Sequence, residues 1–309
     1  VIRKYFVVLI AVILMVGCGD DSNTIYSDTD SETVQISGAA IKGPLAFADV
    51  RIYSLDQTFP DFYDKSSPIS ISITKQFAEI NGLSVPRKIK PPYILSIDGK
   101  NAIDLNTGVA PVIDTLVTVI TEDMLVNNRP VFATPLTTYA FHVARLNTTG
   151  THYKRKRAAR EAFLENLDIA ITNISDTFAI SENYAIDLLR SPLVINDYTT
   201  DLSLQEQAVY HRAAVEAFAA KVHALALGGD ISADTVIEKL ALDFHKDGVI
   251  DNSDNGAHVG SIDPNILSKD PMKLVIPNTS YRIEEIMQLM DAERILIGTN
   301  MGPDFLINE

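Results

Sequence analysis

An acidic segment late in the chain has the residue types and spacing of a calcium site. In DFHKDGVIDNSD, the carboxylates of Asp243, Asp247, Asp251 and Asp254 stand at positions 1, 5, 9 and 12, and the carbonyl of Val249 stands at position 7. Calcium binds six to eight oxygen ligands, and a glycine at position 6 permits the sharp turn that the loop needs. The spacing therefore predicts a calcium loop formed by these five residues.

This segment resembles the EF-hand or dockerin-type calcium loop, which implies a calcium-dependent adhesion or docking module. His245 stands at position 3, and the turn-rich sequence NGAHVGSIDPN follows in place of a second helix. A metal-free alternative stays open, in which Gly248 ends the preceding helix in the left-handed conformation and the aspartates are solvated. Calcium is the only cofactor that the sequence predicts.

The only cysteine of the chain, Cys18, ends an apolar segment. Arg3 and Lys4 precede the apolar run Tyr5 to Val16, an arrangement typical of a secretory signal. The run is shorter than the roughly 20 residues that a membrane-spanning helix needs. We therefore predict a cleaved leader over residues 1–17.

The segment MVGC, which ends at Cys18, resembles the bacterial lipobox, in which the cysteine is lipidated and becomes the new N-terminus. This resemblance implies a lipid anchor in the bacterial cell envelope, and Gly19 in the next position implies sorting to the outer membrane. An ordinary signal peptide with an incidental cysteine is the alternative. The acidic residues 18–33 contain few hydrophobic side chains, which predicts a disordered tether.

Composition and motifs argue against several classes of function. The formal net charge of −14 predicts no nucleic-acid partner, because phosphate contact needs clustered Lys and Arg. With Cys18 carrying lipid, no thiol is left for a disulfide, a thiolate metal site or a nucleophile. The histidines form no close ligand pair, and no nucleophile elbow or phosphate loop occurs. We predict no catalytic residue, and a hydrolase whose site residues lie far apart in sequence is the second alternative.

Residues 34–133 show the alternation of β-strands. In PISISIT, the side chains of Ile69, Ile71 and Ile73 are expected on the buried face, and the hydroxyl side chains are expected on the other. Similar short runs separated by Gly, Pro and Asn turns predict an antiparallel β-sandwich.

Residues 134–309 show the period of helices. Thr134 and Pro135 have the types expected at a helix start, and Ser203 to Glu206 has the pattern of a capping box that opens a long helix. The sequence thus predicts an α+β protein, with a sandwich followed by a mainly helical domain.

Four blocks of the chain, ISGAAIKGPLAFADVRIYSL, DLNTG, ATPLTTYAFHVARL and LALDFHKDGVID, resemble blocks that occur in the same order in a class of bacterial lipoproteins. Those proteins join an Ig-like or transthyretin-like sandwich to a helical region. The resemblance implies architecture and location, and it implies no reaction. We predict a lipid-anchored envelope protein that binds or scaffolds, with the membrane and an envelope protein or glycan as partners.

Overall fold

The strand-rich half of the chain begins at Thr33. The computed structural model describes residues 33–149, 156–178, 180, 186–251, 253–254, 257–258 and 270–300, with residues 253–254 and 257–258 described in their backbone alone. These residues belong to one compact unit. The predicted leader and Cys18 lie outside the described residues. Thr33, which the sequence pattern placed in the tether, is the first residue of a strand.

Short strands follow one another as the alternating pattern predicts. They are β1 (Thr33–Ala40), β2 (Leu45–Ala46), β3 (Asp49–Ser54), β4 (Ser70–Ile73), β5 (Glu79–Pro86), β6 (Tyr93–Asp98), β7 (Ile103–Asp104), β8 (Thr115–Ile120) and β9 (Val131–Ala133). A short helix, α2 (Glu122–Val126), separates the last two strands. The alternating runs of the sequence coincide with β1, β3, β4, β6 and β8, and no such run predicts β2, β5, β7, β9 or α2.

The strands form two main sheets. The order of the larger sheet is β4-β3-β6-β8, and all its pairs are antiparallel. In the smaller sheet, of order β5-β1-β9, β1 is antiparallel to β5 but parallel to β9. A parallel pair needs a long connection, and here the intervening strands supply it. β2 and β7 form a separate antiparallel pair.

Helices dominate the second half of the chain, which confirms the predicted α+β class. They are α3 (Pro135–Thr148), α4 (Lys156–Thr177), α5 (Leu202–Gly229), α6 (Ala233–Phe244) and α7 (Ile286–Ile297), with two 3-10 turns, η2 (Pro271–Lys273) and η3 (Ile283–Glu285). Two short strands, β10 (Ser253–Asp254) and β11 (Ala257–His258), pair with each other. None of the helices in the described ranges is long and apolar enough to cross a bilayer.

Side-chain caps fix where the helices begin. The hydroxyl of Thr134 accepts a hydrogen bond from the Thr137 backbone nitrogen at 3.0 Å, so α3 begins where Thr134 and Pro135 predict. The predicted capping box at Ser203 is wrong. Asp201 caps α5 instead, because its carboxylate accepts from the backbone nitrogen of Ser203 at 2.7 Å.

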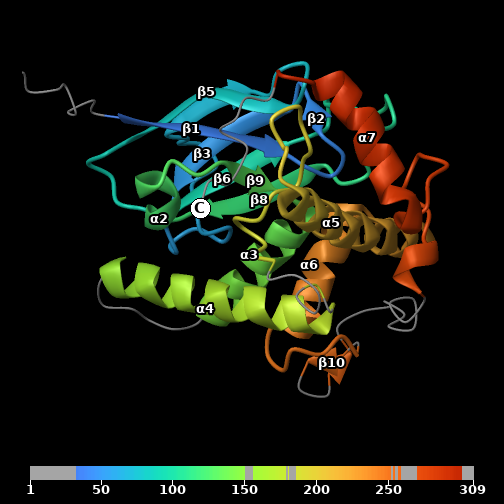
Figure 1. Cartoon of the computed structure of the whole chain (residues 1–309). Coiled ribbons are helices and arrows are strands. Elements are labelled where there is room, and N and C mark those ends of the chain that lie inside the picture. Colours follow the sequence, from blue (N-terminus) through green and yellow to red (C-terminus); the bar gives the residue numbers. More distant parts are fainter. Residues whose placement is uncertain are drawn as a thin grey trace, which may run out of the picture. The chain divides into compact units, whose positions relative to one another are not determined.

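Helix α3 lies between β8 on one side and α4 and α6 on the other (Figure 1). Two neighbouring threonines fasten it to the strand. Thr137 Oγ1 donates to the Val117 carbonyl at 2.8 Å, and Thr138 Oγ1 accepts from the Val117 nitrogen at 2.8 Å. These bonds give both threonines a structural role.

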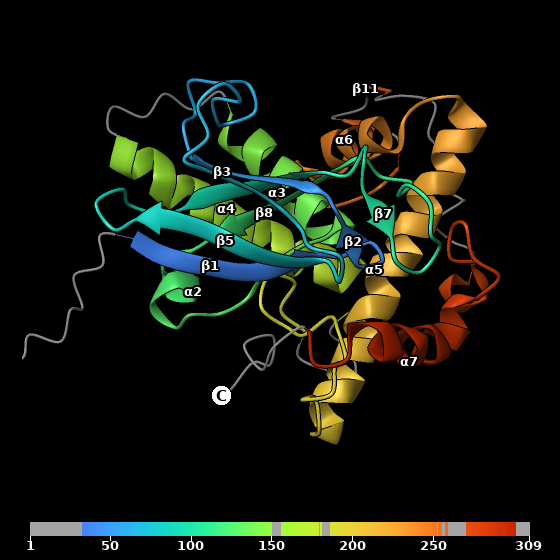
Figure 2. The same cartoon turned by 90° about the horizontal axis from the view of Figure 1, so that it is seen from above.

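The hydrophobic core continues across the predicted boundary between residues 133 and 134. Tyr139 of α3 is fully buried, and its ring centroid lies 5.3 Å from that of Phe218 in α5 and 5.6 Å from that of Phe244 in α6. Helix α7 packs against α5 on a smaller cluster of its own (Figure 2). Strands and helices therefore share one main core.

The predicted polarity of β4 is wrong. Ile71 and Ile73 are exposed, whereas the serines between and beside them are half-buried. The hydroxyls explain the reversal, because Ser72 Oγ donates to the Asn81 carbonyl at 2.7 Å and Ser70 Oγ accepts from the Ser84 nitrogen at 3.3 Å. Serine side chains thus link β4 to β5, and the isoleucines face outward.

Candidate functional site

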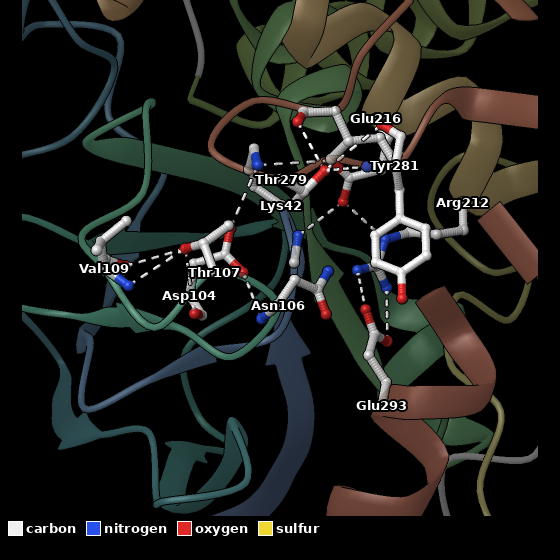
Figure 3. A network of polar contacts seen from close by, with 12 residues as sticks. Lys42, Asp104, Asn106, Thr107, Val109, Arg212, Glu216, Thr279, Tyr281 and Glu293 are labelled. Atoms are coloured by element: carbon white, nitrogen blue, oxygen red, sulfur yellow. Dashed lines mark hydrogen bonds and ion pairs between the residues drawn. The ribbon is translucent and has the colours of Figure 1, made fainter. Parts of the chain in front are cut away.

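Charged side chains from four segments meet in the interior. Lys42 lies in the turn after β1, Asp104 lies in β7, Arg212 and Glu216 lie one turn apart in α5, and Glu293 lies in α7. None is more than 2% exposed. We call these five residues the buried ion chain. Figure 3 shows Lys42 between Asp104 and Glu216, and Arg212 between Glu216 and Glu293.

The signs of the charges alternate along the buried ion chain. Lys42 Nζ lies 3.2 Å from Asp104 Oδ2 and 3.6 Å from Glu216 Oε2. Arg212 Nε donates to Glu216 Oε1 at 2.9 Å, and Arg212 Nη1 donates to Glu293 Oε2 at 3.2 Å. A second guanidinium nitrogen, Nη2, donates to Glu293 Oε1, so this pair is bidentate. Each cation therefore bridges two carboxylates.

The pKa values of the three buried carboxyl groups depend on burial and on the cations that they share. Burial raises the pKa of Glu216, but the charges of Lys42 and Arg212 outweigh burial and hold the pKa below its ordinary value. Burial raises the pKa of Asp104 against the opposing charge of Lys42. Burial likewise raises the pKa of Glu293, which shares its arginine with Glu216. The central carboxylate is thus held ionised most strongly.

The turn that carries Lys42 needs a glycine. Gly43 has a φ of 75°, and its backbone nitrogen donates to Glu216 Oε1 at 2.9 Å. A Cβ atom at Gly43 would lie 2.1 Å from Asp104 Oδ1. The turn residues Lys42, Gly43 and Pro44 therefore bring the backbone close to two buried carboxylates at once.

The buried ion chain joins strands to helices and offers nothing to a substrate. All five groups are paired with one another, and all are closed from solvent. Removing one member would leave a buried charge without its partner, which is costly in a low-dielectric interior. The buried ion chain therefore stabilises the packing of the strands against α5 and α7.

An apolar recess lies beside α5, between the end of α4 and the turns η2 and η3. Its volume is about 420 Å³. The side chains that line it are mostly apolar, namely Thr177, Phe178, Ile180, Tyr210, Ala213, Ala214, Ala217, Phe218, Lys221, Pro271, Met272 and Ile283. Its described lining contains no carboxylate and no histidine. The shape and lining suit apolar groups, and Tyr210 and Lys221 are the titratable side chains of its described lining.

A smaller hollow, of about 100 Å³, brings an aspartate and a histidine together. Asp234, His142 and Thr138 are among its lining residues. The Thr138 hydroxyl accepts from the Val117 nitrogen of β8 and donates to the carbonyl of Thr134, the residue that caps α3. His142 Nδ1 lies 3.2 Å from the guanidinium of Arg145, and burial lowers its pKa to about 3. A weak base beside an engaged hydroxyl gives no support to a hydrolase.

Asp234 in this hollow also has a structural role. Its Oδ1 accepts from the backbone nitrogen of Thr115 at 3.0 Å, which joins the start of α6 to the start of β8. Burial, followed by the charges of Asp114 and Glu238, raises the pKa of Asp234 to about 6. This carboxyl therefore titrates in the range of mildly acidic pH.

The predicted calcium residues lie in and after the last turn of α6. Asp243 is buried, Asp247 and Asp251 are exposed, and the side chain of Asp254 lies outside the described residues. Asp247 Oδ1 accepts from the backbone nitrogen of Val249 at 2.9 Å. Among the residues with described side chains, no three His, Cys, Asp or Glu gather closely enough to hold a metal. Calcium binding stays a prediction.

The turn after α6 has the geometry of the metal-free alternative. Gly248 has a φ of 74°, and its backbone nitrogen donates to the Phe244 carbonyl at 2.9 Å. A left-handed glycine with this bond ends a helix. The lipidation site, Cys18, lies outside the described residues.

Sequence reasoning missed the buried ion chain. The only local signal is the spacing of Arg212 and Glu216, four residues apart on the stripe of α5 that also carries buried apolar residues. Lys42, Asp104 and Glu293 carry no such signal, because their partners lie far away in the sequence. No protein-family model, no curated protein and no solved structure matches the chain.

Proposed function

We propose that this chain is a lipid-anchored protein of the bacterial cell envelope that binds or scaffolds a partner without catalysis. The leader pattern and the lipobox-like residues before Cys18 support the anchor. Gly19 supports the outer membrane as its location. The membrane is then one partner, reached through the lipid on Cys18.

The observation that carries the binding function is the apolar recess beside α5. Its volume of about 420 Å³ suits several apolar side chains, and its lining is poor in hydrogen-bonding groups. A glycan needs such polar groups for its hydroxyls. An envelope protein that inserts apolar side chains is therefore the favoured partner over a glycan.

The strand-rich half of the chain is proposed to be an Ig-like or transthyretin-like sandwich. In support, the sheet β4-β3-β6-β8 and the sheet β5-β1-β9 contribute to one core. Val50 and Ile52 of the first sheet and Ile80 and Leu83 of the second are fully buried within it. The parallel pairing of β1 with β9 is the feature to compare with sandwiches of either type.

The anchor is tested by mass spectrometry of the protein from its native membrane. A polypeptide that begins at Cys18 and carries acyl chains is the expected result. An unmodified thiol at Cys18, or a retained leader in a soluble fraction, would remove the anchor from the proposal.

The recess is tested by filling it. Ala217→Trp places an indole in the recess, whereas Leu202→Trp adds the same group at a residue that is 72% exposed. A partner crosslinked from envelope extract by the wild type and by Leu202→Trp should be lost with Ala217→Trp. Equal capture by both variants would show that the recess does not bind that partner.

The calcium-dependent adhesion module is kept as the alternative function. It rests on the spacing of Asp243, Asp247, Asp251 and Asp254 with the Val249 carbonyl. The left-handed Gly248, whose nitrogen donates to the Phe244 carbonyl at 2.9 Å, supports the metal-free helix end instead. A calcium titration decides between the two.

A further inference from the structure

Three apolar side chains stand outward on one edge of the larger sheet. Ile71 is 61% exposed, Ile73 is 54% exposed and Phe47, in the turn before β3, is 50% exposed. We call these three residues the apolar edge. Single exposed hydrophobic side chains are common, but a contiguous group of them marks a contact surface.

Backbone pairing places the three residues next to one another. Ile71 and Ile73 are two positions apart on β4, so their side chains point to the same side, about 7 Å apart along the strand. The backbone nitrogen of Phe47 donates to the Thr74 carbonyl at 3.1 Å, which holds Phe47 beside the end of β4. Backbone pairing therefore brings three exposed apolar residues to the same edge of the sheet.

The backbone at Phe47 is held in an uncommon conformation. Its φ is 62°, in the left-handed region that residues other than glycine rarely adopt. The bond from its nitrogen to Thr74 and the bond from the Ala48 nitrogen to Thr74 Oγ1, at 2.8 Å, keep the chain in this shape. A strained turn that displays an aromatic ring is typical of a surface that serves a function.

We propose that the apolar edge inserts into the interfacial region of the lipid bilayer that carries the anchor. This inference rests on the proposed lipid at Cys18. Residues 19–32, when extended, span at most about 50 Å. Because the described chain begins at Thr33, this reach bounds how far the described residues can lie from an anchored Cys18, and it permits the apolar edge to meet the membrane.

The residues around the apolar edge fit a membrane surface. Lys75 is exposed beyond the end of β4, and Arg51 lies opposite Ile71 on β3. Asp49 lies opposite Ile73 and 3.7 Å from Arg51, so these two charges pair with each other beside the isoleucines. Interfacial membrane contacts combine aliphatic and aromatic side chains with charged residues that stay at the level of the headgroups.

The size of the surface favours a bilayer over a protein. A stable protein interface buries about 800 Å² on each partner and needs 20 to 30 residues a side. Three side chains are too few for that. They suffice for a membrane contact, because the anchor raises the effective concentration of the bilayer, so that a weak contact is populated.

The chain contains no tryptophan, which permits a direct test. Phe47→Trp introduces a single fluorophore at the apolar edge. The protein would carry Cys18→Ser and a histidine tag before residue 19, and would be held on nickel-chelating vesicles of phosphatidylethanolamine and phosphatidylglycerol. We expect the emission maximum to move to shorter wavelength, and we expect brominated acyl chains to quench the emission.

Two controls define the result. Val126→Trp, at a residue that is 76% exposed, should show neither the shift nor the quenching. Ile71→Ser combined with Ile73→Ser should abolish the shift at Phe47→Trp, with unchanged circular dichroism. Because the tag replaces the lipid, the test is independent of lipidation at Cys18, which mass spectrometry addresses separately.

Two outcomes would overturn the inference. The first is an emission spectrum of tethered Phe47→Trp that vesicles do not change. The second is a shift to shorter wavelength that depends on protein concentration without vesicles, since this would assign the apolar edge to contact between two copies of the chain.

Discussion

Gly43 and Glu216 are joined by a hydrogen bond of 2.9 Å from the backbone nitrogen of Gly43 to Oε1 of Glu216. Through this bond the turn after β1 is fixed to the middle of α5. Lys42 and Arg212 approach the same carboxylate from either side. Glu216 is therefore the point at which the strands, α5 and α7 are coupled.

Glu216→Gln should destabilise the protein strongly. The amide is similar in size, but it removes the charge that Lys42 and Arg212 share. Breaking a buried ion pair costs about 3 to 5 kcal/mol. Urea unfolding at pH 7 measures the loss, with Glu161→Gln in the exposed pair of Arg157 and Glu161 as the matched control. A decrease in the free energy of unfolding no larger than that of the control would show that the buried ion chain does not stabilise the fold.

Gly43→Ala should be far more damaging than Gly82→Ala. Both glycines have nearly the same φ, 75° and 76°, so the left-handed backbone costs each variant about 1 to 2 kcal/mol. Only at Gly43 does the new Cβ collide with a carboxylate, that of Asp104 at 2.1 Å, since nothing lies within 4 Å at Gly82. Thermal melting of the two variants isolates the collision. Equal melting temperatures would contradict the close approach.

The stability of the protein should depend on the titration of Asp234. Its folded pKa of about 6 lies above the ordinary value of 3.8, so the folded state binds the proton more tightly than the unfolded chain does. The resulting stabilisation is complete below about pH 4 and is lost as the pH rises through 6. Asp234→Asn removes this dependence.

Urea unfolding of the wild type and Asp234→Asn between pH 4 and 8 checks this prediction. The free energy of unfolding of the wild type, minus that of the variant, should fall between pH 4 and 6 and stay level above pH 7. Carbon-13 NMR of the Asp234 carboxyl gives the pKa directly. A midpoint near 4 would contradict the buried environment described for this group.

Calcium, if the acidic loop binds it, should stabilise the chain. Ligand at 100 times its dissociation constant adds about 2.7 kcal/mol to the free energy of unfolding. The melting temperature should therefore rise with millimolar calcium in the wild type, and Asp251→Asn should abolish the rise. Asp168→Asn, at an exposed position on α4, is the control and should leave the rise intact. An unchanged melting temperature of the wild type would contradict calcium binding by the loop.

Local signals predicted much of the secondary structure. Thr134 and Pro135 predicted the start of α3, and the helical period of residues 134–309 agrees with α4, in which Phe163 and Leu167, four residues apart, are both buried. These predictions succeed because caps and helical periods involve residues close in sequence. The capping box predicted at Ser203 is wrong because Asp201, two residues earlier, caps the helix instead.

The sequence by itself determined the α+β class, the positions of β1, β3, β4, β6 and β8 and of the longer helices, and the prediction of an anchor at Cys18. Only the tertiary structure decided which face of β4 points outward and which charges are buried. Ser72 faces inward because Asn81 on β5 accepts its hydroxyl, and Lys42 is buried because Asp104 and Glu216 compensate its charge. Periodicity assigns a side chain to a face by its own polarity, whereas burial of a polar group depends on partners that the fold brings from distant segments.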